Sequence, residues 1–168
     1  MSALLWLCGV LAALWLLGVL LSRHVQALVL LLSGSPRIAT ATYDMLVLPG
    51  VVLHELSHVV VALLLGMRVL SINLFQFRSQ GDVRQGEVVV VKVDPLRMSL
   101  VGAAPLFGGI AALLLMVQWL DAPALGFDLK VFDQIRPLLA EPAAALGLYL
   151  LVAIANTMFP SEADRRAW

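Results

Sequence analysis

The sequence predicts an α-helical integral membrane protein with about four transmembrane helices and a small β-hairpin or sheet at the membrane face. Hydrophobic residues make up 61% of the 168 residues, charged residues make up 13%, and the mean hydropathy is +0.97. Soluble domains are about 45–50% apolar and about 25% charged, so this composition indicates an integral membrane protein. The predicted spans cover residues 3–21, 44–66, 96–120 and 141–159, and a stretch rich in β-forming residues covers 67–95. We interpret residues 1–168 as a single membrane-embedded domain.

Charge and cysteine content narrow the classes of partner. Eleven basic residues match eleven acidic residues, which leaves no basic surplus of the kind that nucleic-acid binding requires. We therefore expect a lipid bilayer and other membrane proteins as partners, and no nucleic acid. The single cysteine, Cys8, cannot form a disulfide within the chain, and we interpret it as a packing residue of the first apolar stretch.

The first span, residues 3–21, is interpreted as a retained transmembrane helix. No basic residue precedes it, whereas a signal peptide has a positive n-region and a shorter apolar core. A second apolar run, residues 24–32, follows Arg23 and is too short to cross a bilayer alone, since a span needs about 20 residues. We favour an extended, tilted first helix over an interfacial or re-entrant segment.

The second span, residues 44–66, begins after a polar cluster, Thr40 to Asp44, that offers several helix caps. Pro49-Gly50 predicts a kink inside this helix, and Gly66 predicts its end. Asp44 precedes His54 by ten residues, which is about 15 Å along a straight helix. This distance predicts that His54 lies near the middle of the bilayer.

Two β-runs follow, Val69–Phe77 and residues 87–93, with turn signals at Gly81-Asp82 and Gln85-Gly86 between them. They predict a hairpin or small sheet on the membrane face. It serves either as a surface cover or as an edge that holds a substrate by strand addition. Asp94-Pro95 ends this segment and opens the third span.

The third span carries a stripe of small residues, Ala104, Gly108 and Ala112, which favours close packing with another helix. Gly102 and Pro105 predict a distortion in it. A polar linker with a short amphipathic helix around residues 129–139 is expected next, and the fourth span contains one strongly polar residue, Asn156.

The motif His54-Glu55-Leu56-Ser57-His58 contains the candidate zinc ligands and the candidate general base. Residues four apart share a helix face, so His54 and His58 can offer two imidazole nitrogens to one Zn²⁺, and Glu55 beside them can act as general base. Ionisable side chains in hydrocarbon are costly, at roughly 2.5–3.5 kcal/mol per charge, and by default mark function. The alternatives are a polar cluster that only holds a helix bundle and a zinc site without hydrolysis.

A catalytic zinc site needs a third protein ligand. His24 adjoins Arg23 at a membrane border and suits an interfacial role, so a carboxylate is expected. Asp164, just beyond the fourth span, is the first candidate and Glu162 the second, while Asp44 lies too far along its own helix.

These residues resemble the site-2 protease family of intramembrane zinc metalloproteases. The stretch from Leu48 to Gly66 is similar to that family's metal-binding helix, and the Gly/Pro-containing third span is similar too. Asn156, Pro160 and Asp164 keep the spacing of the family's later motif, although the segment 161–165 departs from its usual Pro/Leu-rich turn and following Gly. The resemblance covers roughly residues 44–164 and implies a compact, minimal member without an accessory peptide-binding domain.

The resemblance implies a zinc endopeptidase that hydrolyses peptide bonds in or near transmembrane segments of membrane proteins. His54, His58 and Asp164 would bind one zinc ion and Glu55 would be the catalytic base. Asn156 would position the substrate backbone or the oxyanion, with a packing role as the alternative. The competing class is a catalytically inactive zinc-binding scaffold or pseudoprotease that binds transmembrane clients. A transporter is disfavoured because the spans lack paired carboxylates and inverted repeats. Short loops suit a prokaryotic inner membrane.

Overall fold

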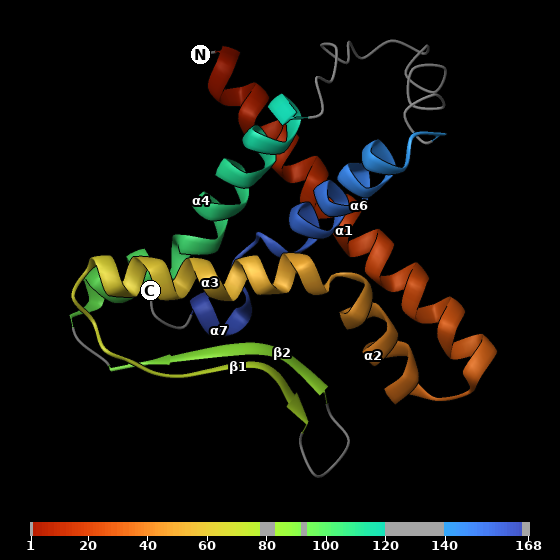
Figure 1. Ribbon diagram of the computed structural model, residues 1–168, viewed down its shortest axis with the longest axis horizontal. Coiled ribbons are helices and arrows are strands. Elements are labelled where there is room, and N and C mark those ends of the chain that lie inside the picture. Colours follow the sequence, from red (N-terminus) through yellow and green to blue (C-terminus); the bar gives the residue numbers. More distant parts are fainter. Residues whose placement is uncertain (1, 78–82, 92–93, 120–139, 166–168) are drawn as a thin grey trace.

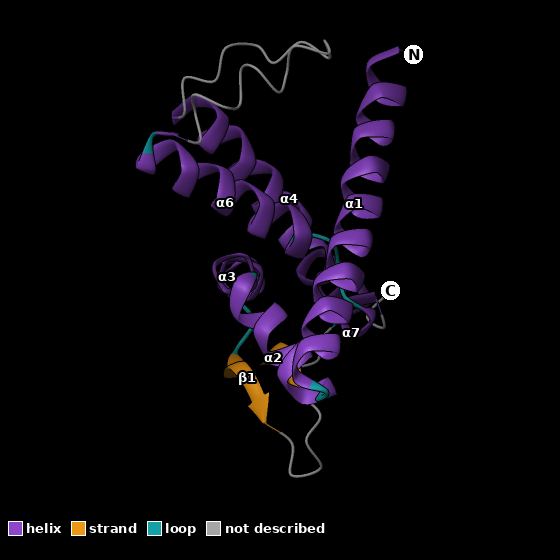
Figure 2. Cartoon of the chain, turned by 90° about the vertical axis from the view of Figure 1, so that its right-hand side faces the viewer, coloured by secondary structure: helices purple, strands orange, loops and turns teal. Residues whose placement is uncertain are grey.

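The computed structural model describes residues 2–77, 83–91, 94–119 and 140–165 (Figure 1). It is mostly helical with one small two-stranded antiparallel sheet. α3 runs through the middle, with α4 and α6 on one side of it and the β-hairpin on the other, an arrangement that both views show (Figures 1 and 2). The elements in chain order are α1 (Ser2–Ser33), α2 (Pro36–Leu46), α3 (Leu48–Leu64), β1 (Val69–Phe77), β2 (Val83–Val90), α4 (Pro95–Trp119), α6 (Pro142–Thr157) and α7 (Glu162–Arg165).

The first helix is longer than the predicted span. α1 continues unbroken for 32 residues through Arg23 and His24 to Ser33, so the extended helix is confirmed and the interfacial and re-entrant alternatives are wrong. His24 is exposed on it, with its Nδ1 2.6 Å from the carbonyl of Leu20. Gly34, at φ +65°, follows the helix and donates its N–H to the Leu30 carbonyl. Such a left-handed residue after a helix is normally glycine.

The predicted second span is two helices. The chain breaks at Val47, and α2 and α3 meet there at a bend of 69°. The span therefore bends, as predicted, but at Val47 and not at Pro49-Gly50. Pro49 lies in the first turn of α3, where a proline's missing N–H has no intrahelical partner to lose. The predicted cap cluster is also wrong, because Thr40 to Asp44 lie inside α2.

The bend separates Asp44 from the helix of the histidines. Asp44 is buried in α2, so a distance counted along one straight helix does not apply to it. By length and composition, the described residues contain two helices that could cross a membrane, within Gly9–Ser33 and Pro95–Met116. The bent pair α2–α3 would make a third, while α6 is apolar but only 16 residues long. The described residues therefore contain two to three candidate spans, fewer than the approximately four that the sequence predicted.

The hairpin is present, with one boundary different from the prediction. Its register pairs Val69 with Val90 and Phe77 with Val83. Gln85 lies opposite Phe75 within β2, so the predicted turn at Gln85-Gly86 is wrong: cross-strand pairing outweighs the local turn propensity. The other predicted turn, at 81–82, the end of the second β-run at 92–93 and the predicted helix at 129–139 lie outside the described residues.

Small residues bring α4 and α6 close to α3. A Cβ on Gly108 of α4 would overlap the Ser57 side chain of α3, and a Cβ on Gly50 of α3 would overlap the carbonyl of Ala153 in α6. Ala104 is buried at 2% exposure. The predicted packing role of the stripe is therefore confirmed for Ala104 and Gly108, while its third member, Ala112, is partly exposed.

The end of α3 is fixed by its cap. Met67 N–H donates to the Ala62 carbonyl at 2.8 Å and Gly66 N–H donates to the Leu63 carbonyl at 3.0 Å, with Gly66 at φ +70°. This is a Schellman cap, and it confirms the predicted stop at Gly66. The chain then turns back below α3 into β1.

Candidate metal centre

The two histidines of the motif project from one face of α3. The helix is regular from Leu48 to Leu64, so His54 and His58 lie one turn apart. Their Nε2 atoms are 3.2 Å apart, and their rings meet edge to face at 80°. Both side chains are largely buried, at 11% and 7% exposure. The pair therefore presents two imidazole nitrogens to one point.

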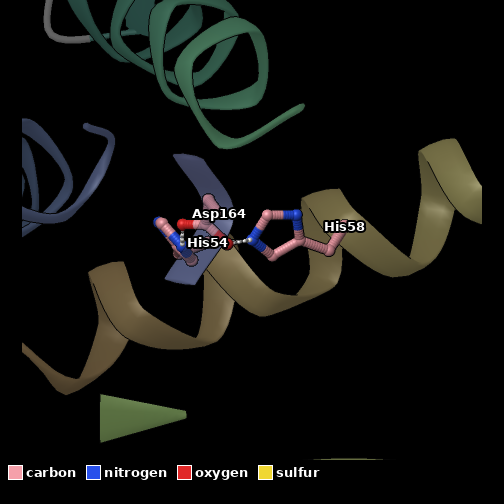
Figure 3. A group of neighbouring side chains, drawn as sticks. All are labelled: His54, His58 and Asp164. Carbon is pink, nitrogen blue, oxygen red and sulfur yellow. Dashed lines mark hydrogen bonds and ion pairs between the residues drawn. The ribbon is translucent and has the colours of Figure 1, made fainter. Parts of the chain in front are cut away.

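Asp164 reaches the same point from the other end of the chain. It lies on α7, which follows the end of α6 after Pro160, and its carboxylate points between the two imidazoles (Figure 3). Asp164 Oδ2 is 3.3 Å from His54 Nε2, and Oδ1 is 3.0 Å from His58 Nε2. Among the residues that the structure describes, these three form a group that could hold a metal ion.

The spacing of the three donors suits a tetrahedral metal. Zinc binds nitrogen and oxygen ligands at about 2.0–2.1 Å, which puts the ligand atoms of a tetrahedral site about 3.3 Å apart. The two Nε2 atoms are 3.2 Å apart, and each lies 3.0 to 3.3 Å from a different oxygen of the Asp164 carboxylate. One ligand atom from each residue lies within 4.8 Å of the other two. Two imidazoles and one carboxylate are also the ligand set of a known class of catalytic zinc site, in which the fourth position stays open.

Backbone carbonyls hold both imidazoles in place. His54 Nδ1 lies 2.6 Å from the Thr157 carbonyl at the end of α6, and His58 Nδ1 lies 2.8 Å from the Val101 carbonyl in α4. A carbonyl oxygen can only accept, so in both rings Nδ1 carries the proton and donates it. Nε2 is then the nitrogen that faces the metal position, which is the usual arrangement of metal-binding histidines.

A local cap sets the position of the Asp164 carboxylate. The Ser161 N–H donates to Asp164 Oδ2 at 2.6 Å, and the Asp164 N–H donates to Ser161 Oγ at 3.3 Å. This reciprocal pair is a capping box at the start of α7. Burial alone would raise the pKa of Asp164, but hydrogen bonds from His54, His58 and Ser161 outweigh it and hold the pKa well below its usual range. The two imidazoles make these bonds through Nε2 protons, which a bound metal ion would displace. The carboxylate is therefore ionised and ready to bind a cation.

Glu55, the predicted base, is buried beside this group. It follows His54 on α3 and only 4% of its surface is exposed. Carboxylates are seldom fully buried without a role or a partner. Its place in the helix next to His54 agrees with the predicted role in proton transfer, which stays a prediction.

The other predicted site residues lie elsewhere. Asn156 of α6 donates its Nδ2 hydrogen to the Val152 carbonyl at 3.0 Å, and its Oδ1 lies 3.5 Å from the Tyr43 hydroxyl, which links α6 to α2. These contacts agree with the packing alternative, and its role toward a substrate stays a prediction. The side chain of Glu162, the second candidate for the third ligand, lies outside the described part of the structure.

Several groups that position the ligands were not predicted. Ser161 has a sequence signal, since Ser161-Glu162-Ala163-Asp164 is the spacing of a capping box. The carbonyls of Thr157 and Val101 have no signal of their own, because any residue has a carbonyl. Both carbonyls can be recognised only from neighbouring residues: Thr157 is the last residue of α6, and Pro105 lies four residues after Val101.

No protein-family model, curated protein or solved structure matches this chain.

Proposed function

We propose that this chain is an intramembrane zinc metalloprotease, a member of the site-2 protease type, that hydrolyses peptide bonds in or near transmembrane segments of membrane proteins. The observation that carries the proposal is the convergence of His54, His58 and Asp164, whose ligand atoms lie within 4.8 Å of one another, on the helix that also carries the buried Glu55. The residues come from α3 and α7, and the apolar helices around them suit a multi-pass protein of a prokaryotic inner membrane.

The donor set favours zinc. Imidazole nitrogen with a carboxylate oxygen in tetrahedral spacing suits Zn²⁺ better than Mg²⁺ or Ca²⁺, which prefer all-oxygen sites with more ligands. Zinc held by His54, His58 and Asp164 would supply Lewis acidity toward a peptide carbonyl and would lower the pKa of water at the site toward ~7.

The chain's own residues handle the proton. The Glu55 carboxylate takes the proton of the attacking water and delivers it to the amine nitrogen that leaves. His54 and His58 keep their Nδ1 protons on the Thr157 and Val101 carbonyls throughout, so their Nε2 atoms hold their direction. Burial of Glu55 excludes bulk water, which strengthens its interaction with the developing charges.

The surroundings suit a substrate held as an extended segment. A transmembrane substrate must unwind before hydrolysis, because a helical peptide bond is shielded by its own hydrogen bonds. An apolar groove of about 380 Å³ lies between α3 and β1, lined by Val59, Leu63 and residues 69–72. Val59, which lines the groove, follows His58 in the sequence of α3. We propose that a substrate pairs with the β1 edge along this groove and reaches the metal centre from there.

The test is Glu55→Gln, an isosteric change that removes the base. Wild type and variant are each expressed in bacterial cells, and new N-termini in the membrane fraction are mapped by mass spectrometry. Wild type is expected to produce termini within apolar segments. The variant should keep one zinc per chain and lose these termini, with cleavage falling at least about 100-fold.

The matched control is Glu141→Gln, an exposed carboxyl at the start of α6 whose side chain makes no cap hydrogen bond. It should leave cleavage unchanged. Termini that persist in Glu55→Gln would contradict the mechanism. Zinc binding by wild type with no new termini at all would favour the scaffold or pseudoprotease instead.

A further inference from the structure

The carbonyl that holds His58 lies in the middle of a helix. Val101 is buried in α4, a helix that runs from Pro95 to Trp119, and its oxygen is 2.8 Å from His58 Nδ1. In a regular α-helix that oxygen would accept the N–H of residue 105. A carbonyl already engaged in this way points along the helix axis and is a poor partner for a side chain on a neighbouring helix.

Residue 105 is a proline, which removes that competition. Pro105 has no N–H to donate, and a proline ring inside a helix also pushes against the carbonyl four residues before it. That carbonyl belongs to Val101. Pro105 is among the largest side chains that are fully buried, so its ring is held in place by packing. Pro105, from which the sequence predicted a distortion of α4, therefore affects one specific carbonyl, that of Val101.

The other histidine is held by a carbonyl freed in a different way. Thr157 ends α6, so its oxygen is one of the last carbonyls of a helix and lacks an intrahelical donor. The N–H four residues later, on Ser161, donates to Asp164 Oδ2 instead. Both imidazoles therefore donate to carbonyls from which the helical donor is missing, in one case through a helix end and in the other through a proline.

We propose that Pro105 is a positioning residue of the metal centre: its missing N–H leaves the Val101 carbonyl to accept the Nδ1 proton of His58, which directs His58 Nε2 at the metal. The inference rests on the proposed metal site and extends it by a residue that touches neither metal nor substrate. Outer partners of metal-binding histidines typically change metal affinity about 10–100-fold.

The competing explanation is that Pro105 only fills space or bends α4. The two explanations differ in what a replacement does. Pro105→Ala and Pro105→Val both supply the missing N–H, but valine fills more of the proline's volume than alanine. A loss due to the N–H should appear in both variants, whereas a loss due to packing should appear mainly with alanine.

The control is Pro95→Ala on the same helix. Pro95 is exposed and occupies the first turn of α4, where an added N–H takes no carbonyl away from a histidine. Zinc affinity is measured for purified wild type and the three variants in detergent by competition with a chelator. Wild type and Pro95→Ala should bind equally, and both Pro105 variants should bind about 10–100-fold more weakly.

A second readout follows the hydrogen bond itself. The chain has three histidines, so labelling histidine with ¹⁵N gives few imidazole signals in the zinc-loaded protein. The Nδ1 proton of His58 should be shifted downfield and protected from exchange in wild type. It should lose this protection in both Pro105 variants, while His54, which donates to Thr157, keeps it.

Unchanged affinity in both Pro105 variants, or a weakened affinity with a protected His58 Nδ1 proton, would overturn the inference. Weakening in Pro105→Ala alone would do so too, because packing would then explain it. Neither readout requires cleavage of a substrate. Failure of wild type to bind zinc would count against the proposed function itself, which keeps the two failures distinguishable.

Discussion

The backbone N–H of Ser161 donates to Asp164 Oδ2 at 2.6 Å, while the N–H of Asp164 donates back to Ser161 Oγ at 3.3 Å. The same Asp164 oxygen lies 3.3 Å from His54 Nε2. One four-residue helix thus fixes the carboxylate at the meeting point of the two histidines. The third ligand is placed by a local cap rather than by a long packed helix.

This cap leads to a prediction for Ser161→Ala. The change removes the hydroxyl acceptor and keeps the backbone donor, so the carboxylate should be less well oriented but still present. Loss of such a cap costs about 1 kcal/mol, which corresponds to a several-fold loss of zinc affinity. Ser33→Ala, which removes a hydroxyl that donates to the Val29 carbonyl on α1, is the control and should bind zinc like wild type. A Ser161→Ala affinity equal to that of wild type would show that the cap does not orient the ligand.

The ligand assignment predicts zinc content. His54→Ala, His58→Ala and Asp164→Ala should each lose most bound zinc, because a catalytic site with only two protein ligands binds weakly. Glu55→Gln should keep about one zinc per chain, since Glu55 is expected to act on the water and not on the metal. Metal analysis of detergent-purified protein checks both statements.

His24→Ala is the control for those variants. His24 is exposed on α1 and bonds the Leu20 carbonyl, so its loss should leave the zinc content unchanged. Zinc retained in Asp164→Ala would mean that Glu162, and not Asp164, is the third ligand. Chelation should abolish the cleavage expected of wild type, and added zinc should restore it.

The two histidines of the candidate metal site were predictable because their signals are local and chemical. His54 and His58 are brought together by the period of one helix, and their hydrocarbon surroundings make a polar surface role implausible. Asp164 lies more than a hundred residues away, and it could be chosen only by elimination and by resemblance. The structure places it with the histidines.

The helix break at Val47 was not predictable in the same way. Proline at position 49 fits a kink within a helix and the first turn of a new helix equally well. Tertiary contacts decide between them: Val47 is 4% exposed, and the Tyr149 hydroxyl donates to the Leu46 carbonyl at 2.9 Å. Likewise, Gln85-Gly86 has the composition of a turn, but Gln85 pairs with Phe75 across the hairpin. Both errors concern boundaries that distant residues determine.

Close helix packing predicts a strong effect of Gly108→Ala. A Cβ at Gly108 would overlap the Ser57 side chain on α3, next to the metal ligands. Overpacking of this kind typically costs about 1–3 kcal/mol. Gly9→Ala is the control, since a Cβ there meets nothing within 4 Å and alanine favours the helix. Thermal unfolding in detergent should show a lower midpoint for Gly108→Ala and an equal or higher midpoint for Gly9→Ala. Equal midpoints would mean that α3 and α4 can separate without cost.

The last prediction separates the two prolines near the metal centre. Pro49 occupies the first turn of α3, one turn before His54, and Pro105 lies within α4, four residues after the Val101 whose carbonyl bonds His58. A first-turn N–H has no intrahelical acceptor, so Pro49→Ala adds a donor without removing a carbonyl from any histidine. We expect Pro49→Ala to keep wild-type zinc affinity, whereas a kink inside a continuous helix would straighten on this change and move His54. Zinc competition binding together with cross-linking of cysteines placed on α2 and α6 checks the affinity and the bend. Reduced zinc affinity in Pro49→Ala would contradict this expectation and mean that Pro49 shapes the site.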